Sequence, residues 1–204
     1  MRWYDTVQEI RARKLELACI DPRGGMPIIP PRGASEKGIA AVEARLRRSL
    51  PPSYRAFLEL HDGWQELYQG ASLLSVRHLA RGTYEDVTRL VLDEWDDTHG
   101  PRALESSRAR GRAARRHVPR GQLVPFGIDA KAETIFAWNL RGPSGDGELE
   151  VVVWINEIGE RIESFPRFLD LILELLTADV EERRRRVSES RLSLGSGQRL
   201  AIPA

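Results

Sequence analysis

The chain has 204 residues, of which 41% are hydrophobic, and a formal net charge of +1. This length predicts one compact domain with additional segments at its ends. The near-zero net charge gives no indication, for the chain as a whole, of a nucleic acid or a membrane as partner. Cys19 is the only cysteine, which excludes an intramolecular disulfide framework and fits a reducing compartment. The sequence lacks both a signal peptide's apolar run and the roughly 20 apolar residues that span a bilayer, so we expect a soluble, cytoplasmic protein.

Three segments precede residue 50. Residues 3–20 carry apolar side chains in partly helical spacing, which is typical of either a short helix or an extended arm. Residues 21–34 contain four prolines and three glycines and are interpreted as a connector. Residues 35–50 predict a helix, and its apolar face is formed by Ile39, Val42, Leu46 and Leu50.

The stretch Leu50–Trp64, LPPSYRAFLELHDGW, reads as a complete helical unit. Its two prolines suit a first helical turn, and Ser53 is the candidate N-cap. The residues at helical spacing on its apolar face are Tyr54, Phe57, Leu58 and His61. Asp62-Gly63 predicts the helix end, because glycine enters the left-handed conformation without a Cβ penalty. Trp64 is expected to fold back onto that end.

The middle of the chain returns to helical periodicity after a short predicted strand at residues 72–76. Residues 84–97 predict a helix whose inward residues are Val87, Leu90, Val91 and Trp95. Its outer side collects the acidic residues Glu85, Asp86, Asp93, Glu94, Asp96 and Asp97. Residues 102–120 then hold seven arginines and a single acid without an apolar stripe, which predicts a mobile or weakly helical excursion.

The remaining elements are predicted strands followed by a helix. Residues 122–128 form the first strand, in which Pro125 favours an edge or a bulge. Residues 133–140 alternate, and the run LEVVVWI at residues 149–155 is typical of a central strand covered on both faces. Arg161-Ile162 predicts a short final strand. Ser164 begins the most hydrophobic helix of the chain, and the polar sequence beyond Val187 predicts poor order.

Several of these segments resemble one known family. The pattern L-P-x-x-Y-x-x-F-L-x-x-x-[ND]-G within Leu50–Gly63 resembles the signature of the SUKH superfamily, named partly for a fungal regulator of cell-wall synthesis. The later segments that resemble this family, in its order, are Leu73-Leu74-Ser75-Val76 with Leu79, Leu123–Gly127, and Ser164-Phe165 with Phe168-Leu169. The chain departs at Asp62, where the family more often has asparagine, and by its arginine-rich insertion before Leu123. The insertion makes any partner surface there peculiar to this protein.

Pattern and resemblance together predict an α+β fold. We expect a mixed, largely antiparallel sheet of about 4–6 strands packed against N-terminal helices and a C-terminal helix. The expected organisation is an N-terminal arm and connector over residues 1–35, a SUKH-like domain over residues 36–177 with the arginine-rich insertion at 102–120, and a C-terminal helix extension with a flexible tail over residues 178–204.

A search for catalytic chemistry in the sequence finds no motif. The four histidines form no metal-ligand pairing, and Cys19 has no histidine near it in sequence. His61 on an apolar face is interpreted as a packing residue. The acidic cluster that includes His99 is interpreted as a solvated helix face rather than a cation site. The sequence therefore predicts no catalytic residue, no metal and no cofactor.

Arginine clusters raise nucleic acid as an alternative partner. The arginines of residues 102–120 and Arg183–Arg186 would suit phosphates, with strong salt dependence. Against this, the segment has no aromatic residues for base stacking, and the acidic helix before it would repel a polyanion. The more economical interpretation is that the arginine segment lies against the acidic helix 84–97 or against an acidic partner.

The resemblance supplies the functional expectation. Bacterial members of the superfamily resemble immunity proteins that bind and neutralise a cognate polymorphic toxin domain, often a nuclease, and fungal members resemble interaction hubs. We therefore expect a bacterial, non-catalytic protein-binding module with a toxin partner. The alternatives are a regulatory or scaffold protein of the Smi/Knr type, a nucleic-acid-binding protein, and an enzyme. The candidate partner-binding residues are Trp64, Glu85, Asp93, Trp95, Asp96 and Asp97, with the two tryptophans equally well explained as core residues. The oligomeric state stays open.

Overall fold

The computed structural model describes residues 2–21, 27–99, 122–143, 146–155 and 158–196. The side chains of residues 2, 93–99, 142–143, 158–159 and 191–196 lie outside this description. The arginine-rich excursion expected at residues 102–120 therefore falls outside the described residues.

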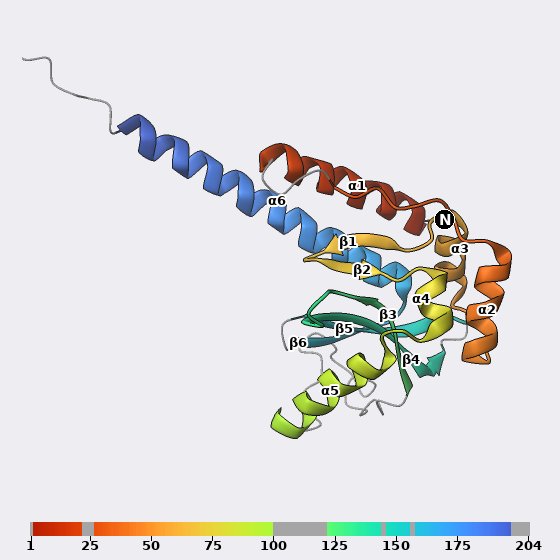
Figure 1. The fold of residues 1–204 in the computed structure, drawn as a ribbon. Coiled ribbons are helices and arrows are strands. Elements are labelled where there is room, and N and C mark those ends of the chain that lie inside the picture. Colours follow the sequence, from red (N-terminus) through yellow and green to blue (C-terminus); the bar gives the residue numbers. More distant parts are fainter. Residues whose placement is uncertain (1, 22–26, 100–121, 144–145, 156–157, 197–204) are drawn as a thin grey trace, which may run out of the picture. The chain divides into compact units, whose positions relative to one another are not determined.

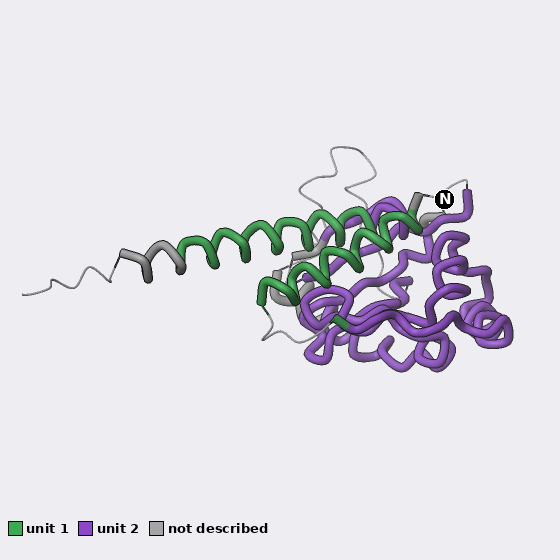
Figure 2. Tube along the Cα trace, turned by 90° about the horizontal axis from the view of Figure 1, so that it is seen from above, with its two compact units in different colours: residues 1–27, 169–204 green, residues 28–168 purple. Residues whose placement is uncertain are grey.

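The chain divides into two compact units (Figure 2). One unit consists of residues 28–168, and the other of residues 1–27 together with residues 169–204. The division falls inside α6 (Phe165–Ser196), whose first turn belongs to the larger unit. Each unit is described by itself below.

The larger unit is built on one antiparallel sheet, in which the described residues form six strands in chain order (Figure 1). The strands are β1 (Trp64–Tyr68), β2 (Ala71–Leu73), β3 (Leu123–Ile128), β4 (Thr134–Pro143), β5 (Leu149–Ile155) and β6 (Ile158–Ile162). Every neighbouring pair is antiparallel. The prediction of an α+β fold with a largely antiparallel sheet is confirmed. The apolar run of β5 is buried along most of its length, because its side chains are covered on both faces.

Four complete helices accompany the sheet in the described part of this unit. They are α2 (Glu36–Leu46), α3 (Pro52–Leu60), α4 (Val76–Arg81) and α5 (Glu85–His99). Helix α2 begins where the Ser35 hydroxyl accepts a hydrogen bond of 3.2 Å from the Gly38 amide, and it ends at Arg47 in the left-handed conformation. The apolar residues Ile39 and Val42 of α2 are fully buried, as the periodicity predicts.

An aromatic cluster forms the core of the larger unit. Tyr54 of α3 lies 4.7 Å from Trp138, 4.9 Å from Phe165 and 5.3 Å from Phe126, measured between ring centroids, each in an edge-to-face arrangement. Phe126 also stacks on Trp138 at 4.7 Å. These rings come from α3, β3, β4 and the first turn of α6. The cluster therefore joins elements that are distant in sequence.

The start and end of α3 differ from the expectation. The predicted N-cap Ser53 lies inside the helix, and the N-cap position is Pro51, which has no capping side chain. The helix ends at Leu60, so that His61 caps its C-terminus instead of continuing the apolar face. Trp64 opens β1, a strand that the sequence analysis did not predict. We return below to the group that serves α3 in place of its own cap.

The inward face assigned to α5 is wrong. Leu90 has 69% and Val87 38% of its surface exposed, whereas Leu92 and Thr88 are each only 2% exposed. The buried stripe of this helix therefore passes through a threonine. This buried stripe could not be predicted from the sequence, because α5 carries apolar residues on more than one face.

The strand containing Pro125 is interior, between β2 and β4, so an edge position is excluded. The alternative, a bulge, is confirmed by the register shift between Pro125 and Gly127. A bulge tolerates proline because one residue there is left out of the ladder.

The smaller unit contains α1 (Arg2–Ile20) and the greater part of α6. Contacts between Thr6 and Asp170, at 3.3 Å, and between Glu16 and Arg184 advance along both helices in the same direction, so the helices run parallel. Helix α6 continues to Ser196, well past Val187, beyond which the sequence predicted poor order. No helix in the described ranges has the length and apolar character of a membrane span.

Candidate functional site

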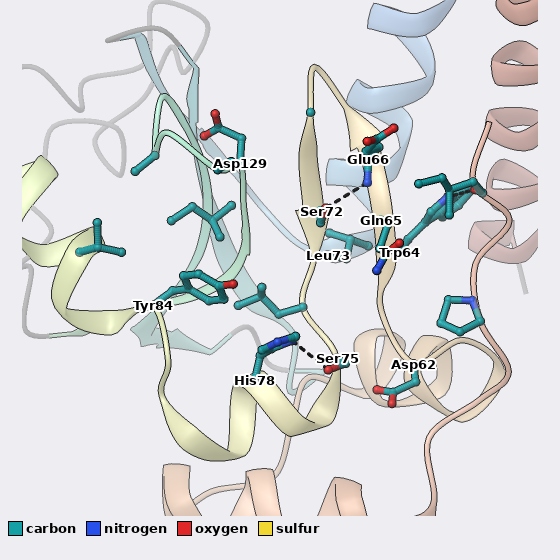
Figure 3. A pocket seen from close by; sticks show the side chains of 18 of the residues that line it. Asp62, Trp64, Gln65, Glu66, Ser72, Leu73, Ser75, His78, Tyr84 and Asp129 are labelled. Carbon is teal, nitrogen blue, oxygen red and sulfur yellow. Dashed lines mark hydrogen bonds between the residues drawn. The ribbon is translucent and has the colours of Figure 1, made fainter. Parts of the chain in front are cut away.

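The larger unit has an open groove of about 750 Å³. Five separate segments line it: residues 28–31, residues 62–66, residues 70–78, the start of α5, and the turn between β3 and β4. In Figure 3, Asp129 and Tyr84 lie on one side, and the β1–β2 hairpin with Ser72 and Glu66 lies on the other. We call this feature the hairpin groove.

Asp62 fixes one end of the hairpin groove. Its Oδ1 accepts a hydrogen bond of 2.7 Å from the backbone amide of Val76, the first residue of α4. The first amides of a helix have no partner within the helix, and a carboxylate there also complements the helix dipole. Asp62 therefore joins the end of α3 to the start of α4. An asparagine oxygen at this position would accept the same bond.

Gly63 allows the chain to turn from α3 into β1 against the opposite strand. Its φ is +82°, and a Cβ added here would lie 2.6 Å from the carbonyl oxygen of Leu73 and 2.9 Å from the amide nitrogen of Ser75. Both distances are shorter than real Cβ contacts, and both are to backbone atoms. Any other residue would push the hairpin away from α4.

Tyr54 supports the same region from the core. It is completely buried, and its hydroxyl lies 3.4 Å from the carbonyl oxygen of Leu74, to which it donates. Burial, with a smaller contribution from the Asp62 carboxylate, raises the pKa of this phenol well above its usual value. The residues of the signature thus position the groove through the core and backbone rather than forming its surface.

A β-bulge shapes the hairpin wall. The register of β1 and β2 shifts between Trp64 and Tyr68, and Glu66 within this bulge has a φ of +50°. The Glu66 amide donates to the hydroxyl oxygen of Ser72 at 3.0 Å. Because the bulge interrupts the alternation, Gln65 and Glu66 are both exposed at the groove.

Apart from one histidine, all the ionisable Asp, Glu, Lys or Arg side chains described as lining the groove are acids. These residues are Asp62, Glu66 and Asp129, and no lysine or arginine is found among the lining residues that the structure describes. The chain as a whole has 31 basic and 30 acidic residues, so the sign of the groove is a local property. Asp129 is held by the amides of Thr134 at 2.8 Å and Lys131 at 3.2 Å. Backbone amides therefore hold two of the three carboxylates, those of Asp62 and Asp129.

His78 is the only histidine of the groove. Its Nδ1 lies 3.0 Å from the Ser75 hydroxyl, and its ring lies 5.8 Å from that of Tyr84. A serine bonded to an imidazole is two parts of a catalytic triad. In the described part of the chain no carboxylate bonds to His78, and the Asp62 oxygen is directed at the Val76 amide. The pair joins the first residues of α4, and among the described residues no carboxylate completes it as a triad.

Two apolar side chains at the groove face solvent. Ile29 has 70% of its surface exposed and Val87 has 38%. Leu90, three residues after Val87 on α5, is 69% exposed. Exposed aliphatic side chains beside a groove are typical of a surface that binds another molecule.

The comparison with known proteins agrees with the signature that positions the groove. The family model for the SMI1 / KNR4 family (SUKH-1) matches residues 33–174. The chain belongs to this family. The match contains α2 to α5, the whole sheet and the beginning of α6. Proteins of the SUKH type are often immunity or regulatory proteins and generally act through protein–protein contacts. No match was found among curated proteins.

Within this SUKH domain, the sequence-predicted binding residues do not all gather at one place. Trp64 lines the groove, but it is 1% exposed and donates from Nε1 to the carbonyl oxygen of Ile28 at 3.1 Å, so it anchors the 28–31 segment. Glu85 forms an ion pair with Arg45. The structure describes only the backbone of the remaining candidates, which all lie in α5. They are Asp93, Trp95, Asp96 and Asp97.

Sequence reasoning missed most of the groove. Ile29 lies in a segment interpreted as a connector, and Glu66 lies in an unpredicted strand. Asp129 follows β3 in a turn. The lining residues that belonged to segments singled out in the sequence are Asp62, Trp64, Leu73, Leu74 and Ser75. Within the described residues there is also no group of three or more His, Cys, Asp or Glu side chains that could hold a metal ion.

Proposed function

We propose that this SUKH protein is a non-catalytic immunity protein that binds and neutralises a cognate toxin domain. The observation that carries the proposal is the uniformly acidic character of the hairpin groove, formed by Asp62, Glu66 and Asp129. A toxin that cleaves nucleic acid needs a basic cleft, and an acidic surface is complementary to such a cleft. The resemblance of bacterial SUKH proteins to toxin-neutralising partners supports the same class of function.

The proposed mechanism is occlusion of the toxin. Complementary charge accelerates the encounter, and apolar contacts made after docking slow dissociation. We include the acidic residues Glu85, Asp93, Asp96 and Asp97 and the tryptophan Trp95 in the proposed surface, because they share the helix α5 with the exposed residues Val87 and Leu90. Trp64 contributes by holding the groove wall.

The arginine run of α6 does not favour nucleic acid as the alternative partner. Arg183 pairs with Asp21, Arg184 with Glu16, and both Arg185 and Arg186 with Glu182. Carboxylates that neutralise these arginines would compete with phosphates. The run is therefore a stabilising feature of the helix pair in the smaller unit.

The test begins with the tagged full-length chain in lysate of its source cell, at about 50 mM and about 300 mM salt. Captured proteins are identified by mass spectrometry. Each is then expressed in a laboratory bacterium, alone and together with this chain. The proposal expects a basic partner that is lost at the higher salt, arrests growth when expressed alone, and permits growth when this chain is present.

A control separates neutralisation from general effects of the protein. The same rescue is measured with a variant of this chain carrying Gly63→Val, which is expected to unfold the groove. A partner that is harmless alone, recovered in a constitutive cellular complex, would replace the immunity function by the regulatory alternative.

A further inference from the structure

We infer that the hairpin groove binds an extended basic segment of a protein partner, in which arginine or lysine side chains alternate with an aliphatic one. The inference takes its partner class from the proposed function, and it assigns the surface and the chemistry that recognises the partner.

The charges of the groove select the sign of the occupant. Asp62 and Glu66 come from the segment 62–66 and Asp129 from the turn after β3, and the described residues that line the groove include no lysine or arginine. Asp62 and Asp129 are half-buried and held by backbone amides, so their carboxylates do not need to be ordered when a cation arrives. Arginine suits such carboxylates, because its guanidinium group donates in a planar fork.

The apolar side chains select the second element of the segment. Ile29 on one wall and Val87 on the other are exposed although they are large and aliphatic. Covering such apolar surface contributes roughly 25 cal/mol of favourable free energy for each Å² removed from water. A peptide with only charged side chains would leave both residues exposed. An aliphatic residue between two basic ones covers them.

The dimensions of the groove favour an extended segment over a helix or a single small molecule. The opening follows the β1–β2 hairpin from Asp62 to Gly70 and reaches the turn at Asp129. An extended chain advances about 3.3 Å per residue and projects successive side chains to opposite sides. A segment of a few residues thus projects side chains toward both walls, and each wall carries an acid, Glu66 or Asp129, and an exposed aliphatic side chain, Ile29 or Val87. A volume of about 750 Å³ accommodates this number of side chains.

The experiment is a titration of the ¹⁵N-labelled full chain, followed by amide chemical shifts. The probe is a capped six-residue peptide of alternating arginine and leucine, and the comparison probe alternates glutamate and leucine. The neutralised variant carries Asp62→Asn, Glu66→Gln and Asp129→Asn. The remaining amide oxygen can still accept the Val76 amide at position 62 and one of the two amides, that of Thr134, at position 129. The matched control carries Glu59→Gln, Glu163→Gln and Glu174→Gln, three exposed acids that are not among the residues lining the groove and that produce the same change in net charge.

The inference expects saturable shifts at Gln65, Ser72, His78 and Asp129 with the basic peptide and not with the acidic one. Affinity is expected to fall about tenfold in the neutralised variant and to stay within about twofold in the matched control. Ile29→Ser is expected to weaken binding without changing its salt dependence.

Four results would overturn the inference. The first is the absence of saturable shifts up to about 1 mM peptide, and the second is equal binding by the neutralised variant. The third is a set of groove shifts that grows with protein concentration without peptide, since the occupant would then be a second copy. The fourth is a set of groove shifts caused by replacing residues 102–120 with a glycine-serine linker, since the occupant would then belong to this chain.

Because the titration contains no toxin, the peptide can bind the groove even if no toxic partner exists. Conversely, the triple variant without the three groove carboxylates could still bind and inhibit a toxin. That result would exclude the groove as the binding surface and leave the proposed function standing.

Discussion

The carboxylate of Glu148 accepts two hydrogen bonds from Ser53, one from the backbone amide at 2.8 Å and one from the hydroxyl at 2.7 Å. Both residues are only 8% exposed. Ser53 lies in the first turn of α3, a helix whose own N-cap residue is Pro51 and lacks a capping side chain. A residue immediately before β5 therefore caps a helix 95 positions away in sequence.

This relationship predicts that Glu148→Ala destabilises the fold by about 2–3 kcal/mol, because the buried Ser53 donors lose a charged acceptor. Urea denaturation followed by tryptophan fluorescence measures the difference. Glu133→Gln is the control, because Glu133 is exposed and its ion pair with Lys131 is long, at 4.0 Å. This variant is expected to change stability by less than about 0.5 kcal/mol. Equal stability of the two variants would show that the Ser53 bonds contribute nothing.

A pair of glycine variants tests the close approach at the start of the hairpin. Gly63→Ala and Gly70→Ala place alanine at almost the same φ, +82° and +79°, but a Cβ at Gly70 has no atom within 4 Å. We expect a cost of about 1 kcal/mol at Gly70, from backbone conformation alone, and a cost of more than about 3 kcal/mol at Gly63. Thermal denaturation of both variants, compared with the parent, measures this. Similar costs would mean that the backbone contacts of Gly63 relax easily.

Alkaline pH is expected to destabilise the protein through Tyr54. The pKa of its phenol is raised in the folded state, whereas in the unfolded chain it lies near its usual value of about 10. The folded chain therefore retains a proton that the unfolded chain releases. The stabilising contribution is complete below about pH 10 and is lost as the pH rises above it, by up to about 1.4 kcal/mol per pH unit.

Urea denaturation at several pH values between about 8 and about 11 measures how the free energy of unfolding depends on pH. Tyr54→Phe keeps the ring and removes the titrating group. Its stability should fall less steeply with pH than that of the parent. The same slope in both proteins would assign the alkaline loss to other groups.

The corrected face of α5 gives a matched pair of leucine variants. Leu92→Ala is expected to cost about 2–4 kcal/mol, because Leu92 is 2% exposed, and Leu90→Ala is expected to cost less than about 0.5 kcal/mol, because Leu90 is 69% exposed. Chemical denaturation distinguishes these values readily. A reversed order would restore the inward face that the sequence alone predicted.

The sequence predicted those elements whose signal is local. The run LEVVVWI predicted a buried strand, and β5 is that strand, because continuous apolar residues have no stable exposed arrangement. The α3 unit was predicted from its prolines, its apolar spacing and its final glycine. Its cap could not be predicted, since the acceptor is Glu148, far away in the chain.

Strand β1 and the face of α5 were missed for related reasons. The bulge at Glu66 places two exposed residues in succession, so β1 lacks the alternation by which strands are identified. In α5 the buried stripe includes Thr88, and the exposed side includes Val87 and Leu90. Exposed apolar residues such as these imitate core residues in a sequence. The hairpin groove was hidden for the same reason, and because its walls come from five segments.

The order of the sheet has a consequence for how this fold accommodates change. Four of the five strand pairings join strands that follow one another across a short connection, and only the β2–β3 pairing spans a long one, residues 74–122. The entropy of closing a loop grows only with the logarithm of its length, so that doubling this connection would cost about 0.6 kcal/mol. Insertions between β2 and β3 are therefore thermodynamically inexpensive and leave the strand register intact. They also begin beside the groove, in the segment that carries α4 and α5. A family with this topology can diversify the surroundings of its binding surface while retaining one sheet and one signature.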